Sequence, residues 1–204
     1  MKKRIIVLMV SIGLSFLITG CGGAKLSPEV AKTFQNKTKM YTQFNMHYNV
    51  SRGHNIIDTT NYQIGFLIPV NSEVTMEDVN AKQLTFLYKG KKIILRDIKK
   101  YSGLDISEVA SKYFSEKKVD LSKFTDTERK AIQTASFVPG MSKDSVLISL
   151  GIPPQHRTPT LKMDTWTYWK NRWATFVVSF KNGKVLPNSN TSTTHARSLN
   201  ISIL

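Results

Sequence analysis

GMSKDSVLISLGIPP (residues 140–154) and DTWTYWKNRWATFVVSFKNGKV (residues 164–185) decide the fold of this chain. The first segment carries both ends of a short helix. Ser142 suits the N-cap, where its hydroxyl accepts a hydrogen bond from a free backbone N–H. Gly151 can take the left-handed conformation that ends a helix, and Ile152 can then fold back onto the helix. Pro153 prevents the helix from continuing. The sequence therefore predicts a helix over about residues 143–150.

The second segment predicts β-structure. Trp166 and Tyr168 alternate with other side chains, and ATFVVSF is rich in β-branched and aromatic residues. Lys181-Asn182-Gly183-Lys184 predicts a hairpin turn, because Asn-Gly readily adopts the two positive φ angles of a type I′ turn. We expect an antiparallel meander of three strands.

A second helix is predicted upstream, where Thr125-Asp126-Thr127-Glu128 forms a capping box. The order from about residue 126 to 185 is then two helices and three strands. This pattern resembles the SmpA/OmlA (BamE-like) family of outer-membrane lipoproteins. The positions that carry the resemblance are Gly140, Met141, Ser142, Val146, Leu150, Gly151, Pro153, Trp166, Tyr168, Val178, Phe180, Gly183 and Val185.

The resemblance covers about a third of the chain and implies both a fold and a function. The implied fold is two helices packed on a three-stranded sheet. The implied function is that of a non-catalytic accessory subunit of the β-barrel assembly machinery, held on the periplasmic face of the outer membrane.

The N-terminus is typical of an exported lipoprotein. Met1-Lys2-Lys3-Arg4 is a positively charged N-terminal region, and the apolar run that follows is shorter than a membrane-spanning helix requires. Ile18-Thr19-Gly20-Cys21 resembles a bacterial lipobox, which predicts a signal peptide over residues 1–20 and acyl chains such as palmitate on Cys21. An ordinary signal peptide with a chance cysteine is the alternative. Since Gly22 and not Asp follows Cys21, the chain resembles lipoproteins forwarded to the outer membrane.

Charge restricts the class of partner. The full chain has a net charge of +15, and removing residues 1–20, which hold three positive and no negative side chains, leaves +12. Basic proteins bind nucleic acid, acidic proteins or anionic membranes. An export signal and the lack of a nucleic-acid-binding signature argue against nucleic acid. Anionic phospholipid or an acidic protein remains, and so does the alternative that the lysines form an ordinary solvated surface.

Residues 40–122 form a different unit. Short apolar–polar alternations separated by Gly, Pro and Asn predict five or six strands, including residues 84–88, whose Leu84, Phe86 and Tyr88 share one face. Asp105-Ile106-Ser107-Glu108 is a capping box for one helix that packs on this sheet. We predict a small antiparallel β domain, either a sandwich or an open barrel, with an SH3-like barrel as the suggested type.

No catalytic, metal or cofactor motif is present in the sequence. HExxH, GxSxG, CxxC and a Gly-rich phosphate loop are all missing. Ser115 and Lys118 form an S-x-x-K that chance explains, and His47 and His54 lack a third ligand. We therefore predict no enzyme activity, no metal and no cofactor, with an enzyme of unrecognised type as the minor alternative.

Aromatic and cationic residues gather after residue 155, and all three tryptophans fall within eight residues. Trp, Tyr and Arg are enriched at binding hot spots and at lipid headgroups. Packing of Trp169 and Trp173 against the rest of the protein is the alternative. The candidate partner surface is His156, Arg157, Trp169, Lys170, Arg172 and Trp173.

The predicted architecture is α+β with five parts. They are a signal peptide (1–20), a lipidated tether (21–39), an N-terminal β-rich domain with a C-terminal helix (40–122), a BamE-like α-α-β-β-β domain (123–186) and a flexible tail (187–204). Two functions stay open: an accessory or scaffold in outer-membrane protein assembly, or an envelope module that binds anionic lipid or peptidoglycan.

Overall fold

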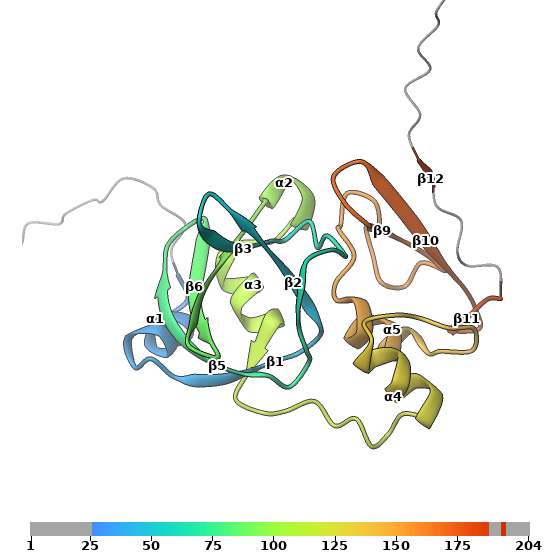
Figure 1. The fold of residues 1–204 in the computed structure, drawn as a ribbon, viewed down its shortest axis with the longest axis horizontal. Coiled ribbons are helices and arrows are strands. Elements are labelled where there is room, and N and C mark those ends of the chain that lie inside the picture. The colour runs from blue at the N-terminus through green and yellow to red at the C-terminus, as the bar shows by residue number, and fades with distance from the viewer. Residues whose placement is uncertain (1–25, 188–192, 195–204) are drawn as a thin grey trace, which may run out of the picture.

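The larger part of the molecule is one curled sheet of eight strands (Figure 1). A computed structural model describes residues 26–187 and 193–194. The strand order is β4-β2-β3-β7-β6-β5-β1-β8. Its strands are β1 (Lys39–Thr42), β2 (Met46–Ser51), β3 (His54–Asp58), β4 (Phe66–Ile68), β5 (Glu73–Val79), β6 (Gln83–Tyr88), β7 (Lys91–Arg96) and β8 (Phe114–Ser115).

The predicted fold class is wrong, beginning with this sheet. It is mixed and not antiparallel, because β3 and β7 run parallel, with Asn55 opposite Ile93 and Asp58 opposite Arg96. A parallel pair needs a long crossover connection, and here the connection is the whole β4–β6 segment. Three helices accompany the sheet where one was predicted: α1 (Pro28–Gln35), α2 (Lys99–Ser102) and α3 (Ile106–Tyr113).

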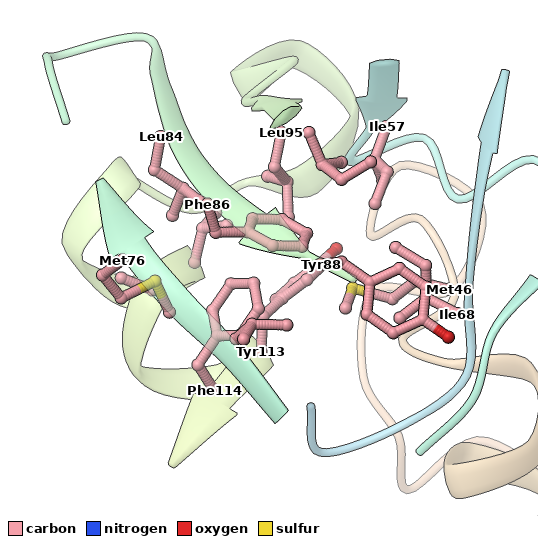
Figure 2. Packing of buried hydrophobic residues seen from close by; sticks show 14 of the residues in the cluster. Met46, Ile57, Ile68, Met76, Leu84, Phe86, Tyr88, Leu95, Tyr113 and Phe114 are labelled. Atoms are coloured by element: carbon pink, nitrogen blue, oxygen red, sulfur yellow. The ribbon is translucent and has the colours of Figure 1, made fainter. Parts of the chain in front are cut away.

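The core of the larger sheet lies between its concave side and α3 (Figure 2). Leu84, Phe86 and Tyr88 point inward together, as predicted, with at most 8% of each exposed. The β6–β7 hairpin turns at Lys89-Gly90, where both φ angles are positive. The capping box of α3 is confirmed, because Asp105 accepts from Glu108 N while Glu108 accepts from Asp105 N.

The predicted tether is partly wrong. Residues 28–35 form α1, with Ser27 Oγ accepting from Val30 N as the N-cap. Val30 and Phe34, four residues apart, are buried against the larger core. Two apolar residues on one helical face are enough to dock a short helix once α3 supplies a surface, and the sequence alone did not reveal that surface. Cys21 and the predicted signal peptide lie outside the described residues.

The C-terminal segment has the predicted local elements but does not match a BamE-like domain. It contains α4 (Asp126–Gln133), α5 (Lys143–Leu150), β9 (Thr165–Trp169), β10 (Ala174–Lys181), β11 (Lys184–Val185) and β12 (Thr193–Thr194). The third predicted strand, β11, is only two residues long. Two residues of the predicted tail, β12, pair with the start of β10; residues 188–192 and 195–204 of that tail lie outside the described ranges. In the described part of the chain, strands hold more residues than helices do.

The C-terminal segment also differs from the predicted separate domain because α4 and α5 are hydrogen-bonded to residues of the larger unit. Asn45 Nδ2 donates to Ile132 O (2.6 Å) and Ser149 O (3.0 Å), at the C-terminal ends of both helices. Asn61 Nδ2 donates to Leu150 O (2.7 Å) and Ile152 O (2.9 Å). Orphan carbonyls at a helix end need such donors. The C-terminal segment therefore shares its hydrogen bonds with the first unit.

Gly151 has a role that differs from the predicted one. Its N–H bonds to Leu147 O at 2.8 Å, but its φ of 75° and ψ of −171° are not left-handed helical. Any Cβ at this position would lie 2.8 Å from the Phe44 ring and 3.0 Å from Asn61 Nδ2. Ile152 packs on the larger core. The glycine is needed because the two units approach each other closely here.

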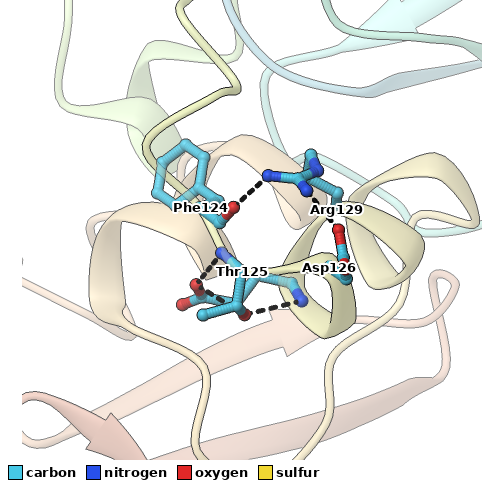
Figure 3. A network of polar contacts seen from close by, with 5 residues as sticks. Phe124, Thr125, Asp126 and Arg129 are labelled. Carbon is cyan, nitrogen blue, oxygen red and sulfur yellow. Dashed lines mark hydrogen bonds and ion pairs between the residues drawn. The ribbon is translucent and has the colours of Figure 1, made fainter.

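A buried carboxylate joins α4 to α5. Glu128, which is 6% exposed, accepts from Thr125 N, Ser142 N and Ser145 Oγ. Desolvation raises the pKa of this carboxyl, but the hydrogen bonds outweigh it and lower the pKa to about 2. Beside it, Arg129 donates to Phe124 O and Asp126 (Figure 3). The N-termini of both helices are thus organised around one negative charge.

Candidate interaction surface

The β9–β10 hairpin separates buried from exposed aromatic residues. Trp166 and Tyr168 share one face of β9, are at most 1% exposed, and pair with Val178 and Phe176. Tyr168 donates its hydroxyl to Gly151 O at 3.0 Å, and burial raises the pKa of that phenol well above its ordinary value. These side chains belong to the core under α5 and are not available to a partner.

The remaining residues of the predicted fold motif also have structural roles. Ser142 caps α5 by accepting from Ser145 N at 3.2 Å. Met141 is 1% exposed in the same cluster as Trp166, and Gly140 has a φ of 85°. Pro153 is buried just after α5. The motif therefore specifies packing.

Trp169 lies where the two units meet. Its carbonyl accepts from Gln63 N at 2.9 Å, and Tyr62 and Trp169 form an isolated parallel β-bridge. The rings of Trp169 and His156 stack at 6.2 Å, and the Arg157 guanidinium lies 5.9 Å from the Trp169 ring. The packing alternative considered for Trp169 is thus correct, and half of the candidate surface forms this joint cluster.

The surroundings of His156 in the joint cluster lower the pKa of its imidazole. Desolvation lowers its pKa, and the nearby positive charges of Arg157 and Lys100 act in the same direction, against a backbone hydrogen bond to Tyr101. Its ring lies 4.6 Å from that of Tyr101, next to α2.

Lys170, Asn171, Arg172 and Trp173 form the turn of the hairpin, which we call the hairpin turn. Asn171 Oδ1 accepts from Trp173 N (2.8 Å) and Ala174 N (3.0 Å), and Lys170 N donates to Ala174 O (2.8 Å). The backbone of the turn is therefore well defined. Trp173 is 70% exposed, and the Arg172 guanidinium lies 4.5 Å from the centre of its ring.

The predicted surface is thus two separate features. His156, Arg157 and Trp169 form the joint cluster, whereas Lys170, Arg172 and Trp173 project from the hairpin turn. An exposed Trp with Arg172 over its ring and Lys170 in the same turn is a suitable group for an interface between an apolar phase and anionic headgroups. The hairpin turn is the candidate functional site.

Sequence reasoning missed a second exposed apolar patch, formed by Val50, Ile64 and Phe66, which are 59%, 48% and 60% exposed. It lies where the edge strand β4 meets β2, with Phe66 stacked on Tyr48 at 5.2 Å. Asn49 Nδ2 binds Ile64 O at 3.2 Å and holds the segment in place. The alternating pattern of these strands predicts burial, so only the position of β4 at the sheet edge reveals the exposure.

His47 and His54 are not brought together with a third ligand in the described part of the chain. His47 lies in β2 and lines a polar cavity of about 200 Å³ with Asp58 and Arg96, whereas His54 begins β3 and is exposed. Burial lowers the pKa of His47. In the described ranges, no three or more His, Cys, Asp or Glu side chains are grouped to hold a metal ion.

No protein-family model, no curated protein and no solved structure matches this chain. None of the helices in the described part has the length and apolar content that a membrane span requires. The candidate site therefore stands on its own geometry and chemistry.

Proposed function

We propose that this protein is a non-catalytic lipoprotein of the outer membrane, anchored through Cys21, that binds an anionic membrane surface on the periplasmic side through its hairpin turn. The single observation that carries the proposal is Trp173, which is 70% exposed under the Arg172 guanidinium at the end of an ordered turn.

The chemistry of the turn suits a phospholipid headgroup layer. An indole ring buries its apolar body among lipid chains while its N–H stays among polar groups. Arginine and lysine beside it attract phosphate, and each basic residue near an anionic surface contributes about 1 kcal/mol. The net charge of +12 that remains without residues 1–20 supports the same attraction over a longer range.

A role in β-barrel assembly rested on the predicted BamE-like domain. Since that fold is not matched, the resemblance no longer supplies a docking geometry, and we prefer the binding-module function. The lipid anchor itself is proposed from the lipobox-like sequence before Cys21.

The test is vesicle binding by the chain from residue 21 onward, with Cys21→Ser so that no lipid is attached. We expect it to sediment with phosphatidylglycerol vesicles at low salt and to be released by 0.5 M NaCl, because screening weakens contacts between surface charges. Phosphatidylcholine vesicles should bind much more weakly.

Variants locate the contact on the molecule. Trp173→Ser and Arg172→Gln should each reduce binding several-fold. Phe66→Ser, at another exposed aromatic residue, and Lys181→Gln, at an exposed lysine at the far end of β10, should have little effect. Binding that is absent, independent of salt or equally reduced by the control variants would reject the proposal.

A further inference from the structure

An apolar cavity lies between the two units and includes none of the hairpin-turn residues. Its volume is about 370 Å³, within the range of small-molecule sites. Phe44 and Leu104 come from the larger unit, and Leu147, Ile152 and Leu161 come from the C-terminal segment. In Figure 1, α5 lies beside the larger sheet, so the cavity exists only when the two units are packed together.

Most uncharged polar side chains in the cavity wall are already engaged within the protein; the exception among the described residues is the exposed Gln155, whose side chain makes no hydrogen bond. Gln43 Nε2 donates to Tyr41 O and Lys117 O, both at 3.0 Å. Ser102 Oγ donates to Asp97 at 2.7 Å, and Thr158 Oγ1 accepts from Thr167 N at 3.0 Å. A sugar or a nucleotide needs several free hydrogen-bonding groups, and this wall does not supply them. Its chemistry suits an apolar ligand.

One cation stands at this apolar wall. Lys112, exposed in the last turn of α3, is the single charged residue among those that line the cavity. It takes part in none of the ion pairs found among the described residues. An apolar wall with one available ammonium group is complementary to a hydrocarbon chain that ends in an anion.

We propose that this cavity binds a long-chain fatty acid, with the acyl chain between Phe44 and Leu147 and the carboxylate at Lys112. The inference goes beyond the proposed membrane contact, because the cavity and the hairpin turn share no residue. Loss of one function leaves the other intact.

The first test uses calorimetric titration of the chain from residue 21 onward, carrying Cys21→Ser, with saturated fatty acids from eight to sixteen carbons below their micelle concentrations. Affinity should rise about fourfold per methylene until the cavity is filled, and then level off. The methyl ester of the best ligand should bind about two- to fivefold more weakly, because it lacks the charge that pairs with Lys112.

Two pairs of variants locate the site. Lys112→Gln should weaken binding of the acid about two- to fivefold, but not binding of the ester; Lys130→Gln, at an exposed lysine in the last turn of α4, should change neither. Leu161→Asp should weaken binding, whereas Met163→Asp should not. These two residues are 41% and 39% exposed on the same loop, and only Leu161 lines the cavity.

Because all four positions are solvent-exposed or nearly so, the variants should keep the thermal midpoint of the parent. Affinity that is independent of chain length, equal affinity for acid and ester, or equal effects of Leu161→Asp and Met163→Asp would overturn the proposal. Vesicle sedimentation of the same variants should be unchanged, which separates failure here from failure of the proposed membrane contact.

Discussion

The two units of this protein are stabilised differently. The larger sheet and α3 enclose one continuous cluster of nineteen buried hydrophobic residues in the described part of the chain. The C-terminal segment there divides its buried hydrophobic residues into groups of nine and three. It also contains a buried carboxylate, Glu128, and its backbone carbonyls accept hydrogen bonds from Asn45 and Asn61 of the larger unit.

This difference indicates that the larger unit supports the smaller one. Small cores bury too little surface to be stable alone, so the C-terminal segment depends on polar groups that a partner surface completes. The joint is also where the candidate ligand cavity forms. Four changes test this comparison, from the largest expected effect to the smallest.

Truncation of Trp166 should have the largest effect. Trp166 is 1% exposed and packs edge-on against Phe180, with ring centres 4.8 Å apart. Trp166→Ala should lower the free energy of unfolding by about 3–5 kcal/mol, through lost burial and the cavity left behind. Urea denaturation followed by circular dichroism measures this. Phe86→Ala, in the larger core, is the counterpart. If Phe86→Ala unfolds the whole chain in one cooperative transition and Trp166→Ala does not, the larger unit folds without the smaller one.

The Glu128 carboxylate should make stability depend on pH. Its pKa is lowered from 4.5 to about 2, so its contribution of about 3 kcal/mol is present above pH 4.5 and is lost as the pH falls towards 2. Glu128→Gln should remove most of this dependence and lower stability at pH 7. Urea midpoints from pH 7 to pH 2 provide the measurement.

Glu108 is the matched control, because it fills the same capping-box position in α3 but is exposed. Glu108→Gln should cost under about 1 kcal/mol and leave the pH profile in place. Equal profiles for the two variants would show that burial of Glu128 is not the cause.

Loss of the Asn61 amide should loosen the smaller unit selectively. Asn61→Ala leaves Ile152 O without its donor and leaves Leu150 O with only Gln63 Nε2, which should cost about 1–3 kcal/mol. Amide hydrogen exchange should accelerate in α5 and not in β6. Asn55→Ala, which removes an exposed bond to Lys92 O, is the control and should affect neither. Uniform acceleration across both units would mean that they unfold as one.

Substitution at Trp173 should have the smallest effect on folding. Because the side chain is 70% exposed, Trp173→Ser should change the free energy of unfolding by less than about 0.5 kcal/mol. The same variant should lose vesicle binding. Trp166→Ala should therefore lower stability, whereas Trp173→Ser should lower binding and leave stability nearly unchanged. A large loss of stability in Trp173→Ser would place this residue in the core.

Local signals in the sequence predicted the helix and turn positions well. Ser142 and Gly151 bound α5 at the expected residues, and the capping boxes at Thr125 and Asp105 start α4 and α3. Period-two alternation placed Trp166 and Tyr168 on the same face of one strand, and the structure shows that this face is the buried one. These features depend on neighbours within a few residues, and that information is present in a single sequence.

What the sequence by itself determined was therefore the caps, the turns and the buried faces, together with the lipobox-like stretch before Cys21, which lies outside the described residues. Only the tertiary structure decided that β3 and β7 pair in parallel, that α1 docks, that Trp169 is packed while Trp173 is exposed, and that a cavity opens beside Lys112. The physical reason is that each of these features depends on side chains distant in sequence, such as Asn61 and Leu150, whose meeting no local pattern encodes.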